Sequence, residues 1–154
     1  ILGACLGQTN PLKPFEFLNG LKTKSHQANL KSAPSFITIT TLDSLNAELE
    51  KHASKPILIK FYADWCASCK HMEVELFQDS EIVHALKNWV LIKADITENT
   101  LSQRELMKGY QVFAPPSIYL FNSKKPSDFM QFHGEIDKKE FIDKLNGFIK
   151  KEAK

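Results

Sequence analysis

Residues 57–70 read ILIKFYADWCASCK, an apolar run followed directly by two cysteines. The run 57–63 is mostly apolar and predicts a central strand that is buried on both faces. Apolar residues then recur at helical spacing from 66 to 77, which predicts a helix that begins around Cys66. Cys66 and Cys69 therefore lie where a strand ends and a helix begins.

The start of a helix is a favourable place for a reactive thiol. The amides of a helix's first turn are unpaired, and the helix dipole is positive there. These groups stabilise a thiolate at Cys66, so we expect its pKa to fall below the free value of about 8.5. Cys69 lies about one turn deeper and is more shielded. We predict that Cys66 attacks a partner disulfide and that Cys69 resolves the mixed disulfide, while Trp65 shapes the face where the partner docks.

Three other interpretations of Cys66-Ala67-Ser68-Cys69 stay open at this point. A structural zinc site needs four ligands, but Cys5 is 61 residues upstream and no histidine pair has suitable spacing. Covalent haem attachment needs a histidine directly after the second cysteine, where this chain has Lys70. A purely structural bridge over so short a segment would constrain little chain and add little stability. We expect disulfide exchange, with no metal at the site.

The rest of the chain alternates strands and helices. Alternating or β-branched apolar segments predict strands at 36–40, 57–63, 89–95, 117–121 and 129–133. Helical spacing predicts helices at 42–53, at 66–77 with a second piece at 80–86, at 102–110 and at 137–151. Thr41 or Asp43 is expected to cap the first helix. This order predicts an α/β fold with a central mixed sheet and helices on both faces.

The composition is that of an ordinary globular protein. The chain has 154 residues, of which 43% are apolar and 25% charged, which argues against a disordered or coiled-coil protein. A net charge of +2 gives no indication of nucleic-acid binding. Residues 1–34 carry four lysines against one glutamate and show no apolar period. We therefore expect a tail and flexible linker at 1–34 and one folded domain at 35–154.

The first seven residues, ILGACLG, are apolar, but they are too few for a complete signal peptide. They could be the cut end of a transmembrane helix, which would make the tail membrane-proximal. Leu2-Gly3-Ala4-Cys5 also resembles a bacterial lipobox, in which Cys5 would be acylated. The third interpretation is an end of the chain with an inert Cys5.

The motifs carry a resemblance to a known family. A strand, the sequence WCxxCK, a helix and a later proline before a strand together resemble the thioredoxin fold. The longer string FYADWCASCK (61–70) is similar to the C-terminal thioredoxin-like domain of the DsbD family of thiol:disulfide interchange proteins. The string ADITEN (94–99) matches the family's strand-end pattern (A/D)-x-T-x-N. The similarity covers about residues 35–150.

The resemblance implies roles for further residues. Pro116, in Ala114-Pro115-Pro116-Ser117, matches the family's cis-proline, which lies across from the cysteine pair and presents backbone to an extended partner. Pro115 could be the cis residue instead, and a rigid turn is the alternative for both. Glu73, one helical turn beyond Cys69, matches an acidic residue near the buried cysteine and could transfer protons during exchange. The alternative for Glu73 is a solvated helix residue.

One strand position departs from the family. Lys60 stands six residues before the first cysteine, where the resemblance leads us to expect aspartate. This puts a proton-relay role for the strand in doubt, or shifts that role to Glu73. A nearby ammonium would also favour the Cys66 thiolate. Alternatively, Lys60 extends to solvent at an edge of the sheet.

The resemblance implies a protein-disulfide reductase that works in an electron relay without a cofactor. It would receive electrons from cysteines of a membrane domain and pass them to an N-terminal partner domain, and thence to periplasmic isomerases or cytochrome-maturation proteins. We expect a monomeric domain that faces the periplasm at the bacterial inner membrane and contacts the membrane only through a missing N-terminal part. Two alternatives stay open: a free or lipid-anchored thioredoxin-like reductase of secreted proteins, and a thioredoxin-fold binding module without turnover.

Overall fold

A computed structural model describes residues 33–122, 124–125 and 127–152 of the chain. Five strands form a single sheet: β1 (Ile37–Ile39), β2 (Pro56–Tyr62), β3 (Val90–Asp95), β4 (Ser117–Asn122) and β5 (Phe129–His133). Their order across the sheet is β1-β3-β2-β4-β5. The strand that leads to the two cysteines, β2, is thus the middle strand.

The sheet is mixed, as the sequence predicted. Strands β1 and β2 both pair with β3 in parallel. Strand β4 pairs antiparallel with both β2 and β5, so β4 and β5 form the expected hairpin. The carboxyl ends of β2 and β3 meet at one edge of the sheet, and the segments that follow them are neighbours there.

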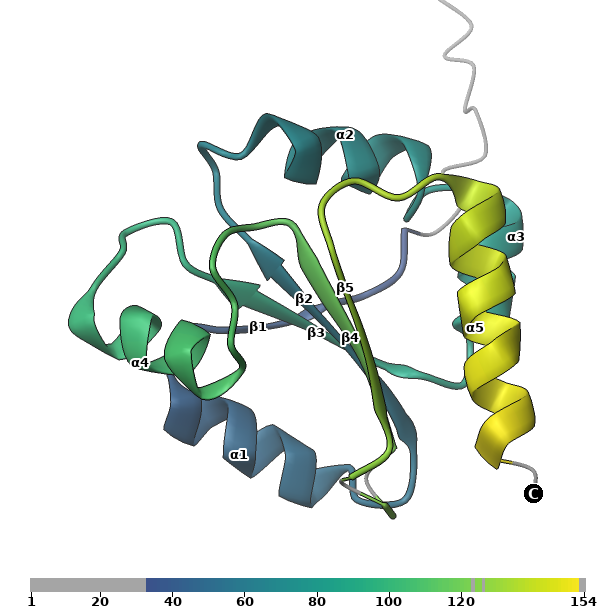
Figure 1. The fold of residues 1–154 in the computed structure, drawn as a ribbon, viewed down its shortest axis with the longest axis horizontal. Coiled ribbons are helices and arrows are strands. Elements are labelled where there is room, and N and C mark those ends of the chain that lie inside the picture. Colours follow the sequence, from purple (N-terminus) through teal and green to yellow (C-terminus); the bar gives the residue numbers. More distant parts are fainter. Residues whose placement is uncertain (1–32, 123, 126, 153–154) are drawn as a thin grey trace, which may run out of the picture. The chain divides into compact units, whose positions relative to one another are not determined.

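Five helices cover the sheet: α1 (Leu42–Lys51), α2 (Ala67–Glu75), α3 (Ser80–Ala85), α4 (Leu101–Gly109) and α5 (Lys138–Glu152). Helices α1 and α4 lie on one face, and α2, α3 and α5 lie on the other (Figure 1). The predicted α/β fold with helices on both faces is therefore confirmed.

Side-chain caps fix where several helices begin. Thr41, one of the two expected candidates, caps α1 and forms a capping box with Ser44. Thr100 and Gln103 form the same arrangement at the start of α4. Helix α1 ends at Lys51, two residues before the predicted end, and Pro56 then begins β2.

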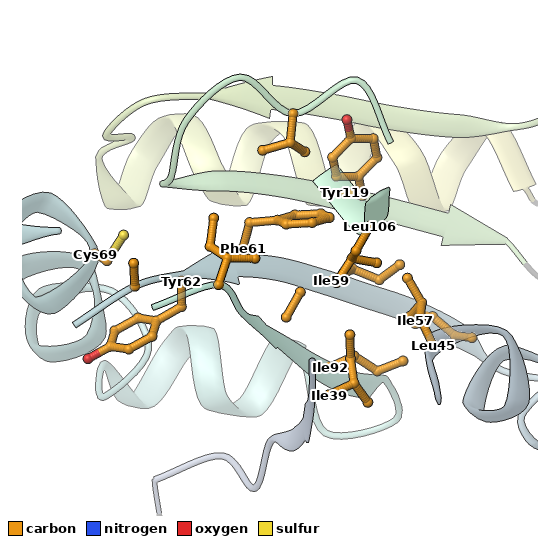
Figure 2. Packing of buried hydrophobic residues seen from close by; sticks show 14 of the residues in the cluster. Ile39, Leu45, Ile57, Ile59, Phe61, Tyr62, Cys69, Ile92, Leu106 and Tyr119 are labelled. Carbon is orange, nitrogen blue, oxygen red and sulfur yellow. The ribbon is translucent and has the colours of Figure 1, made fainter. Parts of the chain in front are cut away.

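Alternation along β2 divides the core between the two faces. Ile57, Ile59 and Phe61 pack with residues of α1 and α4, and the same cluster is drawn in Figure 2. Leu58 faces the other way and packs with residues of α2, α3 and α5. Each such buried apolar side chain contributes about 1.5–3 kcal/mol relative to an exposed one. The two-sided burial of β2, as predicted, makes it the rigid support of the residues that follow.

The expected tail and linker fall almost wholly outside the described residues. Cys5 and the apolar segment 1–7 lie there as well. Among the helices that the structure describes, none has the length and hydropathy needed to cross a bilayer.

Candidate active site

The two cysteines form a disulfide at the start of α2. Their sulfurs are bonded, with a Cα–Cα distance of 5.3 Å. Cys66 is the N-cap residue of α2, and its Sγ accepts a hydrogen bond from the backbone N–H of Cys69 at 3.1 Å. Cys66 is 7% exposed and Cys69 is 4% exposed. The pair therefore lies at the junction of β2 and α2, and Figure 2 shows Cys69 near the end of β2 that carries Tyr62.

Trp65 stands beside the disulfide and remains 63% exposed. Its indole N–H donates to the carbonyl of Thr97 at 3.1 Å, which fixes the ring against the segment after β3. The Thr97 hydroxyl accepts from the backbone N–H of Asp64 at 3.0 Å and donates to Asp95 at 2.5 Å. Asp95 and Thr97 thus hold the loop before Cys66. The sequence showed them only as part of a family pattern, without this role.

The loop before β4 approaches the disulfide from the other side. The peptide bond between Pro115 and Pro116 is cis. Pro116 and Cys69 line the same cavity, whose volume is about 10 Å³. The Ser117 hydroxyl donates to the Ala114 carbonyl at 2.9 Å, and the N–H of Gly134 donates to the Pro116 carbonyl at 2.9 Å. The loop is therefore anchored at both ends while Ala114 stays exposed.

Phe113 is a site neighbour that the sequence did not single out. It directly precedes Ala114 and is 91% exposed. A large apolar side chain left so open beside the cis-proline loop in sequence offers contact area to a docking protein. The signal available in the sequence was an aromatic residue directly before the Ala-Pro-Pro string.

Lys60 and Glu73 form an ion pair beneath α2. The Lys60 ammonium lies 2.7 Å from Glu73 Oε1. Lys60 is 5% exposed and belongs to the middle strand, so the expectation that it extends to solvent at a sheet edge is wrong. Burial lowers the pKa of Lys60, and the bond to Glu73 opposes that change. The Glu73 side chain is 34% exposed, so it connects the buried ammonium with the surface.

Tyr62 and Asp64 are the remaining polar residues at the end of β2. The Tyr62 hydroxyl donates to Asp64 Oδ1 at 2.9 Å. Burial, together with this bond and the negative charge of Asp64, raises the pKa of Tyr62 to about 12. Asp64 itself is exposed beside the disulfide, and Tyr62 is neutral at physiological pH.

Metal ligands do not gather in the part of the chain that the structure describes. No group of three or more histidine, cysteine or acidic residues lies close enough there to hold an ion. His71 instead contacts Glu135, and His133 lies 2.8 Å from the Ser117 hydroxyl. The two sulfurs of Cys66 and Cys69 are the groups of this site that can undergo disulfide exchange.

The family model that matches the chain is that of thioredoxin, over residues 36–147. The chain therefore belongs to the thioredoxin family. A fold of this kind is also found in chloroplastic thioredoxin z, with a TM-score of 0.57 at 13% identity, covering 75% of this chain and 95% of that one.

Within the family, the chain is similar to the thiol:disulfide interchange protein DsbD. It is 36% identical over 124 residues to DsbD of Salmonella typhimurium, covering 80% of this chain and 21% of the relative. It is 31% identical over 144 residues to DsbD of Campylobacter jejuni, covering 94% of this chain and 24% of the relative. The chain thus spans between a fifth and a quarter of these relatives.

The match falls on one domain of DsbD. The oxidised C-terminal domain of Neisseria meningitidis DsbD superposes with a TM-score of 0.61 at 26% identity, covering 72% of this chain and 98% of that domain. The chain is therefore a thioredoxin domain homologous to the C-terminal domain of DsbD, with Cys66 and Cys69 as its Cys-x-x-Cys active site. The resemblance inferred from the sequence is confirmed.

Proposed function

We propose that this domain relays electrons by dithiol–disulfide exchange from a membrane domain to periplasmic partner proteins. The observation that carries the proposal is the Cys66–Cys69 disulfide at the start of α2, beside the cis-Pro116 loop. Similarity to the thiol:disulfide interchange protein DsbD supports an exchange role for this pair. The relay needs no further cofactor, because the electrons travel on the two sulfurs.

The chemical step uses the two cysteines in turn. In the reduced domain, the Cys66 thiolate attacks one sulfur of the partner disulfide, and the partner's other sulfur leaves as a thiolate. Cys69 then loses its proton to the Glu73 carboxylate by way of Lys60, which is bonded to Glu73, and the Cys69 thiolate attacks the Cys66 sulfur. The Cys66–Cys69 bond forms and the mixed disulfide breaks. Two electrons end on the partner, whose two thiolates take up protons from Glu73 and solvent.

The surface around the disulfide is suited to an extended partner segment. Trp65, which precedes Cys66, and Ala114, in the loop before β4, are both exposed. Pro115 and Pro116 carry no N–H, so the loop can offer a partner only carbonyl acceptors at these two positions, and the Pro116 carbonyl already accepts from the N–H of Gly134. We propose that the partner supplies the donors and lies across Ala114, Pro115 and Pro116.

The proposed setting follows the DsbD relatives. The electron donor is the membrane domain, and the first acceptor is an N-terminal DsbD-like domain, from which electrons pass to periplasmic isomerases or cytochrome-maturation proteins. The domain faces the periplasm at the bacterial inner membrane as a monomer. Residues 1–34 serve as the membrane-proximal tail and linker, and the folded domain is 35–154.

A trapping experiment tests the exchange. Cys69→Ser leaves Cys66 able to attack but removes the resolving thiol, so we expect a lasting mixed disulfide with the oxidised N-terminal domain of a DsbD relative. Cys66→Ser is the matched control and should give no such adduct. Peptide mass spectrometry assigns the bond to Cys66 rather than to Cys5. If Cys69→Ser traps nothing, a binding module without turnover becomes the better explanation.

A further inference from the structure

Lys60 is an unusual residue for its place in the fold. Every other residue of β2 is apolar or tyrosine, yet Lys60 is only 5% exposed in the middle strand. Lysine is almost never buried to this extent unless it is paired. The burial of Lys60 therefore depends on the groups that surround its ammonium.

The ammonium is held by one carboxylate and by aromatic faces. Glu73 Oε1 lies 2.7 Å away. The Lys60 Nζ stands 3.9 Å from the ring centroid of Phe36, 4.7 Å from that of Phe77 and 5.9 Å from that of Tyr62. Such rings attract a cation through their electron-rich faces. The positive charge is thus fixed in place beneath α2.

Two cavities meet at Lys60. The inner one, of about 10 Å³, is lined by Lys60 together with Cys69 and Pro116, and Glu73 does not border it. The outer one, of about 170 Å³, is lined by Lys60 together with Glu73 and Phe36, and Cys69 does not border it. Lys60 is therefore the member of the ion pair that borders the cavity at the buried cysteine, and Glu73 borders only the outer cavity.

The inner cavity gives this arrangement its electrostatic effect. A space of about 10 Å³ is at the lower limit for one water molecule, so little solvent can screen a charge there. Interactions between charges are several times stronger in such surroundings than in water. A thiolate formed at Cys69 would therefore be poorly screened from the charge of Lys60, which lines the same cavity.

Other charged groups lie near Lys60 from the neighbouring strands. Lys93 of β3 is its register partner and helps to lower the pKa of Lys60, after burial. Tyr62 follows on β2, and Asp64 and Asp95 act on Tyr62. Glu73 is the acidic group bonded to the Lys60 ammonium.

We propose that Lys60 is a positioning residue of the exchange site, whose ammonium stabilises the thiolate of Cys69 while the mixed disulfide is resolved. Lys60 borders both cavities, so it can pass a proton to Glu73 and take up the proton of Cys69 in its place. After this transfer the ammonium has lost its charged partner Glu73 and gained the Cys69 thiolate. The thiolate then attacks the Cys66 sulfur, the Cys66–Cys69 bond forms and the partner thiolate leaves. This inference rests on the proposed function and deepens it.

Charge variants at the pair test the proposal in the full chain. Lys60→Met removes the ammonium and leaves the Glu73 carboxylate, so we expect the pKa of the Cys69 thiol to rise by about one unit or more. Lys60→Arg keeps the charge and should restore a value near that of the native protein. Lys60→Met with Glu73→Gln removes both charges and should give an intermediate value. Alkylation of the reduced protein across pH, read by peptide mass, reports each cysteine separately.

A matched control uses the register partner. Lys93→Met makes the same charge change one strand away, without touching the cavity at Cys69, and should give a smaller shift. The proposal would be overturned if Lys93→Met and Lys60→Met shifted the pKa of Cys69 equally. It would also be overturned if the Cys69 pKa values of the Lys60 variants did not follow their charge. If Lys60 acted through packing alone, the Cys69 pKa values of the variants would not follow their charge. Methionine is chosen because an apolar side chain suits this apolar strand and preserves folding.

The two proposals fail in distinguishable ways. If native protein forms no mixed disulfide, the proposed function fails and the role of Lys60 fails with it. If native protein exchanges normally and Lys60→Met leaves the Cys69 pKa unchanged, only the inference about Lys60 is overturned. The expected result is slower resolution of the mixed disulfide in Lys60→Met at neutral pH, recovering as the pH rises.

Discussion

The tyrosines show how burial at single residues sets the response to pH. The chain has three of them, and desolvation is the largest cause of the raised pKa at each one. Burial raises the pKa of Tyr62 and Tyr119 to about 12, and it also raises the pKa of Tyr110. The folded chain therefore keeps protons that the unfolded chain loses near pH 10.

A pH titration checks this at the residue scale. The tyrosine hydroxyls have higher pKa values in the folded chain than in the unfolded chain. Their contribution to the stability of the folded state is therefore complete below about pH 10 and is lost as the pH rises through about 12. We expect no tyrosinate absorbance near pH 10 in the native protein and a full transition there in urea. Tyr62→Phe should remove one of the three tyrosine contributions to the tyrosinate absorbance. A native transition at pH 10 would contradict the burial of these hydroxyls.

Burial of Lys60 changes the stability of the folded chain with pH in the opposite direction to burial of the tyrosines. Its pKa is lowered from 10.5, mainly by burial, so the unfolded chain takes up a proton that the folded chain holds less tightly. Stability therefore rises with pH from the folded pKa up to 10.5. Absorbance isolates the tyrosines from this effect, since lysine has no chromophore.

At the scale of elements, the hairpin of β4 and β5 supports the cis-proline loop. Ser117 begins β4, is fully buried, and pairs in register with His133 of β5. Its hydroxyl holds the Ala114 carbonyl and contacts His133 Nδ1. The loop thus takes its position from the hairpin rather than from the disulfide.

Ser117→Ala tests this support. We expect the free energy of unfolding to fall by about 1 kcal/mol, because a hydrogen bond is lost and its partners are left unpaired. The KM for a protein partner should rise, since the loop at 114–116 is less well held. Alkylation of Cys66 by a small reagent should not change. Ser102→Ala, on an exposed position of α4, is the control and should alter none of the three. A drop in stability without any change in KM would separate the hairpin from docking.

Much of this architecture could be predicted because local patterns determine it. The apolar run of β2 and the helical spacing after it locate Cys66 and Cys69 without any tertiary information. The isomer at Pro116 could not be read from residues alone, since the cis and trans forms before proline differ by only about 0.5–1 kcal/mol. Thr41 was foreseen as a cap because capping depends on a few adjacent residues.

The partners of polar side chains were harder to predict. Lys60 meets Glu73 only because α2 folds back over the middle strand, and these two are 13 residues apart. Trp65 meets the segment after β3, and Ser117 meets β5, through sheet register. Such pairings depend on how whole elements are placed, so composition and spacing left the role of Lys60 open.

At the scale of the whole molecule, the reduced and oxidised forms differ in what stabilises them. Reduction breaks the Cys66–Cys69 bond and creates thiolates that the start of α2 and the Lys60 ammonium can stabilise, while Glu73 opposes this. A domain that strongly stabilises its dithiol form becomes an oxidant, as in proteins with potentials near about −120 mV. The opposing charges of Lys60 and Glu73 favour a moderate reduction potential for the Cys66–Cys69 pair.

We therefore expect a reduction potential of about −270 to −200 mV for the Cys66–Cys69 pair, the range of proteins that hand electrons on. Equilibration in glutathione or dithiothreitol buffers, with alkylated thiols counted by mass, gives the value. Because folding and oxidation are linked, the difference in unfolding free energy between the two forms must equal 2F times the difference in reduction potential between the folded and the unfolded chain. Urea unfolding of each form checks that equality independently. A potential near about −120 mV would mean that electrons flow toward this domain, and the relay proposed here would run in the wrong direction.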